Sequence, residues 1–305
     1  QQQLRLGGHA EATHLPLNQT LTAFDLLERH VELNATATPS QIRALAALTQ
    51  CPPEKATLEA LVTSPEVATS TMSVLDLLQM HTSCGLDLAA FLAMLRPVKA
   101  RTYSISSSPL ETDGQCTLTV AVVQGPARSG LGQYSGVAST FLARAKPGQT
   151  IPVAVRASPA PFHLPSDPTT PLVLIAAGSG IAPMRGFLQE RHLMAQRGVE
   201  VGKALLYFGC DHPQVDFLYR EELQTWADAG IVEVKPAFSQ QPEDGVRYVQ
   251  DKLRADTDWI DMAKAGAHLY VCGGKAMAQG VRLALRESLL DFDTVVRHYA
   301  EDVFA

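Results

Sequence analysis

The chain has 305 residues, a net charge of −6 and a hydrophobic content of 46%, so it has enough apolar residues for a large core in about two globular domains. It has no lysine or arginine run and no apolar run of the roughly 18 to 20 residues that cross a bilayer, which argues against nucleic acid or a membrane as a partner. The five cysteines are scattered without a C-x-x-C pair, so we expect no zinc site, iron–sulfur cluster or disulfide framework and a cytoplasmic protein.

The first long segment, residues 21–96, has the spacing of helices, because apolar side chains recur at intervals of three and four residues. Thr38 directly before Pro39 is typical of a helix start, and Pro52 and Pro53 interrupt the pattern further on. The composition predicts a helical subdomain without evident chemistry of its own.

The stretch Arg-Thr-Tyr-Ser-Ile-Ser-Ser-Ser-Pro at 101–109 predicts a strand that ends in a loop. On an extended chain, Arg101 and Tyr103 lie on one face and Ser104 on the other. An arginine beside an aromatic ring can clamp a pyrophosphate while the ring stacks on a planar heterocycle, which suggests a flavin dinucleotide. A half-buried strand that runs into a serine-rich turn is the alternative.

Further strand-like segments at 116–124 and 150–156, with glycine and proline turns between them, predict an antiparallel barrel. Several strands are needed to close such a barrel and too few precede residue 101, so we expect the early strands to be missing from the chain. Gly136 begins a segment typical of a turn that opens a short helix, whose amides near Ser139 can hold an anion.

From residue 171 the pattern changes to short apolar strands that alternate with helices. This alternation predicts a parallel sheet flanked by helices, with ligands at the carboxyl ends of the strands. The expected strands are 172–176, 204–208, 232–238 and 268–272.

Two of these strand ends carry candidate site residues. After the first strand, Gly178 and Gly180 let a phosphate approach the backbone at the N-terminus of the next helix, although a structural tight turn is the alternative. Cys272 ends the last long strand, where plain packing is the common role of a buried cysteine. No histidine is placed by motif to make Cys272 a nucleophile.

The motif at 101–109 resembles the R-x-Y-S flavin motif of the ferredoxin-NADP reductase superfamily, and its S-S-P tail is similar to the diflavin reductase branch. Residues 21–96 are similar to the connecting insertion of diflavin reductases. The strings H-L-P-L and T-P-S-Q-I-R-A-L-A resemble the version that is fused to bacterial fatty-acid-hydroxylating P-450 haem domains. The resemblance extends through almost the whole chain.

This resemblance implies a ferredoxin-NADP reductase-like fold of the α/β plus β-barrel class. An antiparallel FAD-binding barrel is expected over 1–20 and 97–168, and a helical connecting subdomain over 21–96. A parallel-sheet domain that binds NADP(H) is expected over 169–305.

The resemblance also implies roles for the residues that match the family's motifs. The expected FAD ligands are Arg101, Tyr103, Ser104, Gly136, Val137, Ala138, Ser139 and Phe304. The expected NADPH ligands are Gly178, Ser179, Gly180, Ser239, Gln240, Arg247, Tyr248, Gln250 and Cys272. The expected catalytic residues are Ser104, Cys272, Asp302 and Phe304, and no metal ligand is implied.

Ser104, Cys272 and Asp302 match the family's serine, cysteine and terminal carboxylate, which orient hydride transfer and stabilise the charge that develops. Phe304 stands in place of the tryptophan that covers the flavin ring and moves aside before nicotinamide stacks. Because phenylalanine is smaller and has no hydrogen-bond donor, we expect it to be displaced more easily.

The sequence departs from the family's pattern mainly around the 2'-phosphate of the cofactor. Gln240 stands where an arginine is expected, Val246 occupies a lysine position with Arg247 beside it, and Asp211 replaces a frequent arginine. Each charged hydrogen bond to a phosphate contributes roughly 1.5 to 3 kcal/mol, so the loss of two lowers the preference for NADPH on the order of a hundredfold. NADPH is the expected cofactor, and NADH remains a competitor. Gly274 replaces an aspartate on the nicotinamide side.

The resemblance therefore implies the FAD- and NADPH-binding reductase module of a self-sufficient cytochrome P-450 monooxygenase, an NADPH-haemoprotein reductase. Its partners would be an FMN-binding domain and a P-450 haem domain in the same polypeptide. A free-standing cytochrome P-450 reductase, a sulfite reductase flavoprotein and a non-catalytic flavin-binding interaction module are the alternatives. The terminal electron acceptor, the hydroxylated substrate and the oligomeric state stay open.

Overall fold

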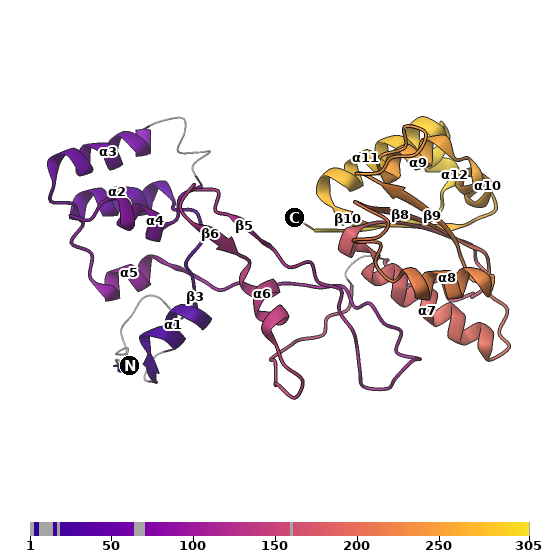
Figure 1. The fold of residues 1–305 in the computed structure, drawn as a ribbon, viewed down its shortest axis with the longest axis horizontal. Coiled ribbons are helices and arrows are strands. Elements are labelled where there is room, and N and C mark those ends of the chain that lie inside the picture. The colour runs from indigo at the N-terminus through magenta and orange to yellow at the C-terminus, as the bar shows by residue number, and fades with distance from the viewer. Residues whose placement is uncertain (1–2, 6–14, 17–18, 64–70, 159–160, 305) are drawn as a thin grey trace. The chain divides into compact units, whose positions relative to one another are not determined.

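The computed structural model of the chain describes residues 3–5, 15–16, 19–63, 71–158 and 161–304 (Figure 1). The chain divides into two compact units. The first contains residues 1–102 and 122–146, and the second contains residues 103–121 and 147–305. Segment 103–121 is thus grouped with the later part of the chain, and the domain boundaries expected at residues 20, 96 and 168 stay a prediction.

The first unit has the helices that the spacing over residues 21–96 predicts. They are α1 (Ala23–Arg29), α2 (Pro39–Leu48), α3 (Pro52–Thr63), α4 (Val74–Met80) and α5 (Leu88–Met94). The start of α2 at Thr38 is confirmed, because Thr38 and Gln41 exchange side-chain to backbone hydrogen bonds in a capping box. The buried core of this unit includes Leu26, Ile42, Leu45, Leu58, Leu77 and Leu92.

Short antiparallel strand pairs accompany these helices. Strand β1 (Gln3–Arg5) pairs with β2 (Thr20–Thr22), and β3 (Val31–Glu32) pairs with β4 (Arg96–Pro97). Strand β5 (Gln124–Pro126) pairs with β6 (Gln133–Ser135), and helix α6 (Val137–Arg144) follows Gly136, as the sequence predicts.

The longer strands expected between residues 101 and 156 do not form. The segments 101–106 and 116–124 are reduced to an isolated bridge between Ile105 and Leu118, with β5 beginning only at Gln124. Residues 150–156 contain no strand, and Val153 and Val155 are 80% and 78% exposed. A strand requires a neighbour for its hydrogen bonds, and the described residues offer no pairing partner to 150–156.

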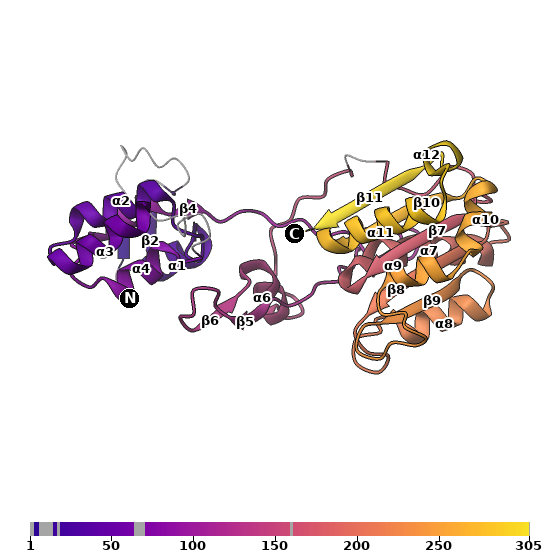
Figure 2. The same cartoon turned by 90° about the horizontal axis from the view of Figure 1, so that it is seen from above.

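The second unit is organised by a five-stranded parallel sheet in the order β11-β10-β7-β8-β9 (Figure 2). Its strands are β7 (Leu172–Ala177), β8 (Ala204–Cys210), β9 (Glu233–Phe238), β10 (His268–Gly274) and β11 (Tyr299–Phe304). The four strands expected from the apolar runs are confirmed, and β11 extends the sheet on one edge. The chain order reverses between β7 and β10, which is the place where ligands bind in sheets of this kind.

Helices cover both faces of this sheet, which explains the apolar runs of its central strands β7, β8 and β10. Leu172, Leu174 and Ala176 of β7 belong to the core beneath α7 (Ile181–Gln196) and α8 (Arg220–Asp228). Val173 and Ile175 belong to the opposite core, which is packed under four further helices. These are α9 (Val249–Ala255), α10 (Asp258–Lys264), α11 (Lys275–Ser288) and α12 (Phe292–Val295).

Within the described ranges, no helix combines the length and the apolar character that crossing a bilayer requires. In the same part of the chain, histidine, cysteine and acidic side chains form no group of three or more that could hold a metal ion.

Replacing Gly180 with alanine tests the packing at the switch point. An added Cβ at Gly180 would lie 2.1 Å from the backbone oxygen of Cys272, so the start of α7 would have to move away from β10. We expect Gly180→Ala to lower the free energy of unfolding in denaturant titrations by about 1 to 3 kcal/mol.

Gly274→Ala is the matched control, because its Cβ would meet no atom within 4 Å and its φ of −69° suits alanine. We expect this variant to stay within about 0.5 kcal/mol of the unsubstituted chain. Equal stability of the two variants would contradict the close approach of α7 to β10.

Candidate active site

The carboxyl ends of β10 and β11 bring three of the expected catalytic residues together. Cys272 on β10 is paired in register with Asp302 on β11, and the Cys272 sulfur lies 4.0 Å from Asp302 Oδ2. The Ser104 hydroxyl, from segment 103–121, donates a hydrogen bond to the same carboxylate oxygen. A hydroxyl, a thiol and a carboxylate from three separate parts of the chain therefore meet at one edge of the sheet.

Burial determines the chemistry of the thiol in this group. Cys272 is only 1% exposed. This burial raises the pKa of its thiol, and the neighbouring Asp302 carboxylate raises it further. The sulfur therefore stays protonated at neutral pH and is not a nucleophile, so Asp302 supplies the only negative charge of the three residues.

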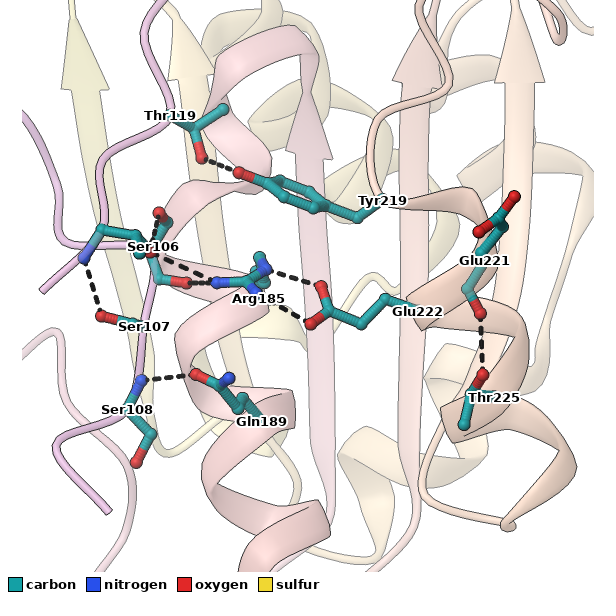
Figure 3. A network of polar contacts seen from close by, with 11 residues as sticks. Ser106, Ser107, Ser108, Thr119, Arg185, Gln189, Tyr219, Glu221, Glu222 and Thr225 are labelled. Atoms are coloured by element: carbon teal, nitrogen blue, oxygen red, sulfur yellow. Dashed lines mark hydrogen bonds and ion pairs between the residues drawn. The ribbon is translucent and has the colours of Figure 1, made fainter. Parts of the chain in front are cut away.

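Arg185 on α7 holds the segment that carries Ser104 (Figure 3). Its guanidinium donates to the Ser106 carbonyl oxygen at 2.6 Å and to the Thr117 hydroxyl at 3.3 Å. The other side of the guanidinium forms a bidentate ion pair with Glu222 of α8, at 2.6 and 2.8 Å. Arg185 thus links α7 and α8 to both arms of segment 103–121.

Further contacts fix the same segment. The Ser108 amide donates to Gln189 Oε1 at 2.8 Å, and the Ser108 hydroxyl donates to Glu190 at 2.9 Å. The hydroxyls of Thr119 and Tyr219 share a hydrogen bond of 2.7 Å. The centre of the Tyr219 ring lies 4.7 Å from the Arg185 guanidinium carbon. Tyr219 adopts a left-handed φ of 58°, which non-glycine residues rarely do.

Sequence reasoning missed these anchoring residues. One signal was present, because Arg185 interrupts the otherwise apolar start of α7, and a charged residue at such a position requires a partner. Its partner Glu222 lies 37 residues further along the chain, and no local spacing connects the two.

The glycine turn after β7 adjoins this group. Gly178, Ser179 and Gly180 form a single 3₁₀ turn before α7, and Gly178 has a left-handed φ of 53°. The close approach of Gly180 to the Cys272 backbone places the N-terminus of a 16-residue helix beside the end of β10. Such a helix start attracts a phosphate, so the turn fits the diphosphate of a dinucleotide.

Another group of expected ligands gathers at the ends of β8 and β9. The Ser239 hydroxyl donates to Asp211 Oδ1, and the Gln240 amide donates to the Asp211 carbonyl oxygen at 2.9 Å. Arg247 donates through Nε to the Ser239 carbonyl oxygen at 3.1 Å, and its guanidinium lies 5.6 Å from the Tyr248 ring. The 47% exposed ring of Tyr248 provides a flat surface on which a base can stack.

Gln250 gives an independent sign of a ligand. Its Oε1 atom is buried and has no hydrogen-bond partner among the described residues. A buried acceptor without a donor lowers stability, so a bound molecule that donates to it would remove this cost. The residues at the carboxyl edge of the sheet therefore fit a nicotinamide dinucleotide.

The expected flavin ligands belong to both units. In the first unit, Arg101 lies 3.5 Å from Glu32 and donates to the Lys99 carbonyl oxygen at 2.9 Å. Helix α6 begins at Val137 and Ala138, and the hydroxyl of the buried Ser139 accepts a hydrogen bond from the Val123 amide. An added Cβ at Gly136 would lie 2.8 Å from this hydroxyl, so a larger residue there would displace the Ser139 side chain. The start of α6 fits a pyrophosphate.

In the second unit, Tyr103 is half-buried and directly precedes Ser104. Phe304 ends β11 and is 42% exposed. It lies two residues beyond Asp302 on the same strand, so both side chains point to one face of the sheet. An aromatic ring that is accessible beside Asp302 fits the stacking role that the sequence predicts.

Comparison with known proteins gives two family matches. The FAD binding domain model matches residues 2–141, and the oxidoreductase NAD-binding domain model matches residues 174–283. Together these matches cover most of the chain.

Several fused P-450 proteins are similar in sequence. A self-sufficient cytochrome P-450 monooxygenase of Phanerodontia chrysosporium is 47% identical over 278 residues, which are 89% of this chain and 26% of the relative. The bifunctional cytochrome P-450/NADPH–P-450 reductase 1 of Bacillus subtilis is 42% identical over 283 residues, 91% of this chain and 27% of the relative. A bifunctional relative from Fusarium oxysporum is 40% identical over 291 residues, 90% of this chain and 27% of the relative. The chain thus spans about a quarter of the length of these relatives.

Replacing Arg185 tests how segment 103–121 is held. Arg185→Met keeps the aliphatic stem but removes the bonds to Ser106, Thr117 and Glu222. A charged hydrogen bond contributes about 1.5 to 3 kcal/mol, so we expect the Ser106 amide, which donates to the Thr117 carbonyl oxygen, to exchange its hydrogen at least ~10-fold faster.

The matched control is Arg254→Met, which removes an arginine that pairs with Glu287 on the other face of the sheet. Exchange at Ser106 should not change in this variant. The same unchanged exchange in Arg185→Met would show that the ion pair does not hold the segment.

Proposed function

Because the chain belongs to the diflavin reductase family and carries its FAD-binding and NAD-binding domains, we propose that it is the reductase module of a self-sufficient cytochrome P-450 monooxygenase. The two domains make it an NADPH-dependent flavoprotein oxidoreductase. The fusion to a haem domain is the proposed part, and the names of relatives that are 40–47% identical over most of this chain support it.

The observation that carries the proposed chemistry is the meeting of Ser104, Cys272 and Asp302 beside the glycine turn. The turn supplies a phosphate site, and the three side chains line the adjacent end of β10 and β11. These residues would hold a nicotinamide dinucleotide, with the turn at its diphosphate and Asp302 available to its nicotinamide end.

The bound cofactors supply the redox chemistry, which is the transfer of a hydride from the nicotinamide of NADPH to FAD. Asp302 holds a fixed negative charge that stabilises positive charge on a hydride donor. Ser104 keeps its proton directed at Asp302 Oδ2, which orients both groups. The protonated Cys272 thiol fills the space beside them and excludes water without adding a second charge.

We assign the flavin contacts of the first unit to Arg101 and residues 136–139, and those of the second unit to Tyr103 and Phe304. An arginine and the start of α6 suit the pyrophosphate, and the aromatic rings suit the flavin. In this proposal, the accessible Phe304 ring covers the flavin and moves aside when nicotinamide binds.

From FAD, electrons are proposed to pass singly to an FMN-binding domain and then to a P-450 haem domain in the same polypeptide. The name of the Bacillus subtilis relative joins a cytochrome P-450 and an NADPH–P-450 reductase in one protein, which supports this route. We also propose a cytoplasmic location, which is supported by five free cysteines.

Sequencing the reading frame upstream of Gln1 tests the fusion, because an FMN-binding and a haem-binding region should be encoded there. A frame without a haem domain would instead favour a free-standing reductase.

Anaerobic reduction tests the core of the proposal. The purified protein, loaded with FAD, should show the absorbance of oxidised flavin, and NADPH should bleach it within seconds. Ferricyanide should then restore the absorbance. Flavin that binds but is not bleached by either nicotinamide dinucleotide would identify a non-catalytic flavin-binding module.

Asp302→Asn tests the role of the carboxylate. The loss of its charge should slow bleaching by NADPH on the order of a hundredfold, because a preorganised charge stabilises the transition state. The FAD content should stay the same, and NADPH deuterated at the transferred position should slow bleaching more than it does in the unsubstituted protein.

Asp293→Asn, which alters an exposed partner of Arg286, is the control and should leave the rate unchanged. An Asp302→Asn protein that bleaches at the original rate contradicts a role of this carboxylate in hydride transfer. Lost FAD would point to a structural role instead.

A further inference from the structure

The end of β8 carries a carboxylate at a position that selects between the two nicotinamide dinucleotides. Strand β8 lies next to β7 on the side away from β10, so it is the second strand counted from the glycine turn. In sheets of this order, an acidic residue after the second strand accepts a hydrogen bond from the ribose 2'-hydroxyl of NAD, whereas an arginine nearby accommodates the 2'-phosphate of NADP. Asp211 directly follows β8.

Backbone contacts fix this residue in place. The Ser239 amide donates to the Cys210 carbonyl oxygen at 3.0 Å, and the Gln240 amide donates to the Asp211 carbonyl oxygen, which continues the pairing of β8 and β9 beyond their ends. The Asp211 amide itself donates to Asp216 Oδ2 at 2.7 Å. The backbone of Asp211 is therefore fixed on both sides by hydrogen bonds.

The carboxylate of Asp211 is also oriented. The Ser239 hydroxyl donates to Oδ1, and among the described residues Oδ2 takes part in none of the hydrogen bonds of this group. The side chain is exposed at the carboxyl edge of the sheet. An exposed, preoriented oxygen suits a hydroxyl donor and repels a phosphate.

The cationic charge at this site is limited. Arg247 already donates through Nε to the Ser239 carbonyl oxygen and faces the Tyr248 ring. It is opposed by two carboxylates, since Asp216 accepts the amides of Asp211 and His212 beside it. One arginine next to two acidic residues is a weak site for a dianionic phosphate.

We propose that Asp211 is the specificity-determining residue of the dinucleotide site, and that its carboxylate binds the ribose 2'-hydroxyl of NADH. NADH then competes with NADPH as the hydride donor, with kcat/KM values for the two within about a hundredfold of each other. This inference rests on the proposed reductase function, since it concerns the same dinucleotide site.

Binding of nucleotide fragments tests the inference without turnover. Calorimetry on the FAD-loaded protein would compare ADP, which has the 2'-hydroxyl, with 2',5'-ADP, which has the 2'-phosphate. We expect 2',5'-ADP to bind no more than about 10-fold more tightly than ADP. In Asp211→Asn, the ratio should shift towards 2',5'-ADP by about 10-fold or more, because the negative charge is removed.

Asp228→Asn is the matched control. This exposed carboxylate ends α8, and the helix leads to the amino end of β9, so the residue belongs to the opposite edge of the sheet. The binding ratio should not change in this variant. The ratio of the affinities for 2',5'-ADP and ADP can be measured in the unsubstituted protein alone. This measurement therefore still tests the inference if Asp211→Asn does not fold.

Two results would overturn the inference, and they are distinguishable from a failure of the proposed function. They are a preference for 2',5'-ADP above about a thousandfold in the unsubstituted protein, or an unchanged ratio in a folded Asp211→Asn variant. If neither fragment binds and neither dinucleotide bleaches the flavin, the reductase function itself is wrong, and the inference falls with it.

Discussion

The bidentate pair between Arg185 and Glu222 is the interaction that holds the segment carrying Ser104. Residues 103–121 have almost no secondary structure, so backbone pairing alone cannot fix their position. The guanidinium joins this segment to two helices at once. It binds the Ser106 carbonyl oxygen, and Ser104 lies only two residues before Ser106. The side chains of Arg185 and Glu222 are 13% and 29% exposed, which gives their bonds more weight than a surface pair has.

A second constraint places the glycine turn at residues 178–180 next to the carboxyl end of β10. Gly180 leaves no room for a side chain against the Cys272 carbonyl, so the start of α7 and the end of β10 share one small region. This close contact fixes the distance between the turn and Cys272. The parallel sheet supplies a rigid base for both elements, because β7 and β10 are hydrogen-bonded neighbours whose central side chains, such as Leu174 and Val271, are fully buried.

The sequence predicted the parallel sheet well because its information is local. The central strands are apolar runs, as in Leu172–Ala177, and the glycine turn and Cys272 stand at strand ends where ligands gather. The strand expected at 150–156 was wrong for the opposite reason, since alternation describes a strand only when a neighbouring strand exists. The pairing of Arg185 with Glu222 could not be predicted, because a contact between residues far apart in the sequence produces no periodic pattern.

The raised pKa of the buried Cys272 has a consequence for oxidative damage. Reduced flavins generate peroxide when oxygen reaches them, and peroxide attacks thiolates rather than thiols. Cys272 is protonated and buried, so its thiol reacts slowly with peroxide. Cys116 is exposed, so peroxide reaches it more readily than it reaches the buried Cys272.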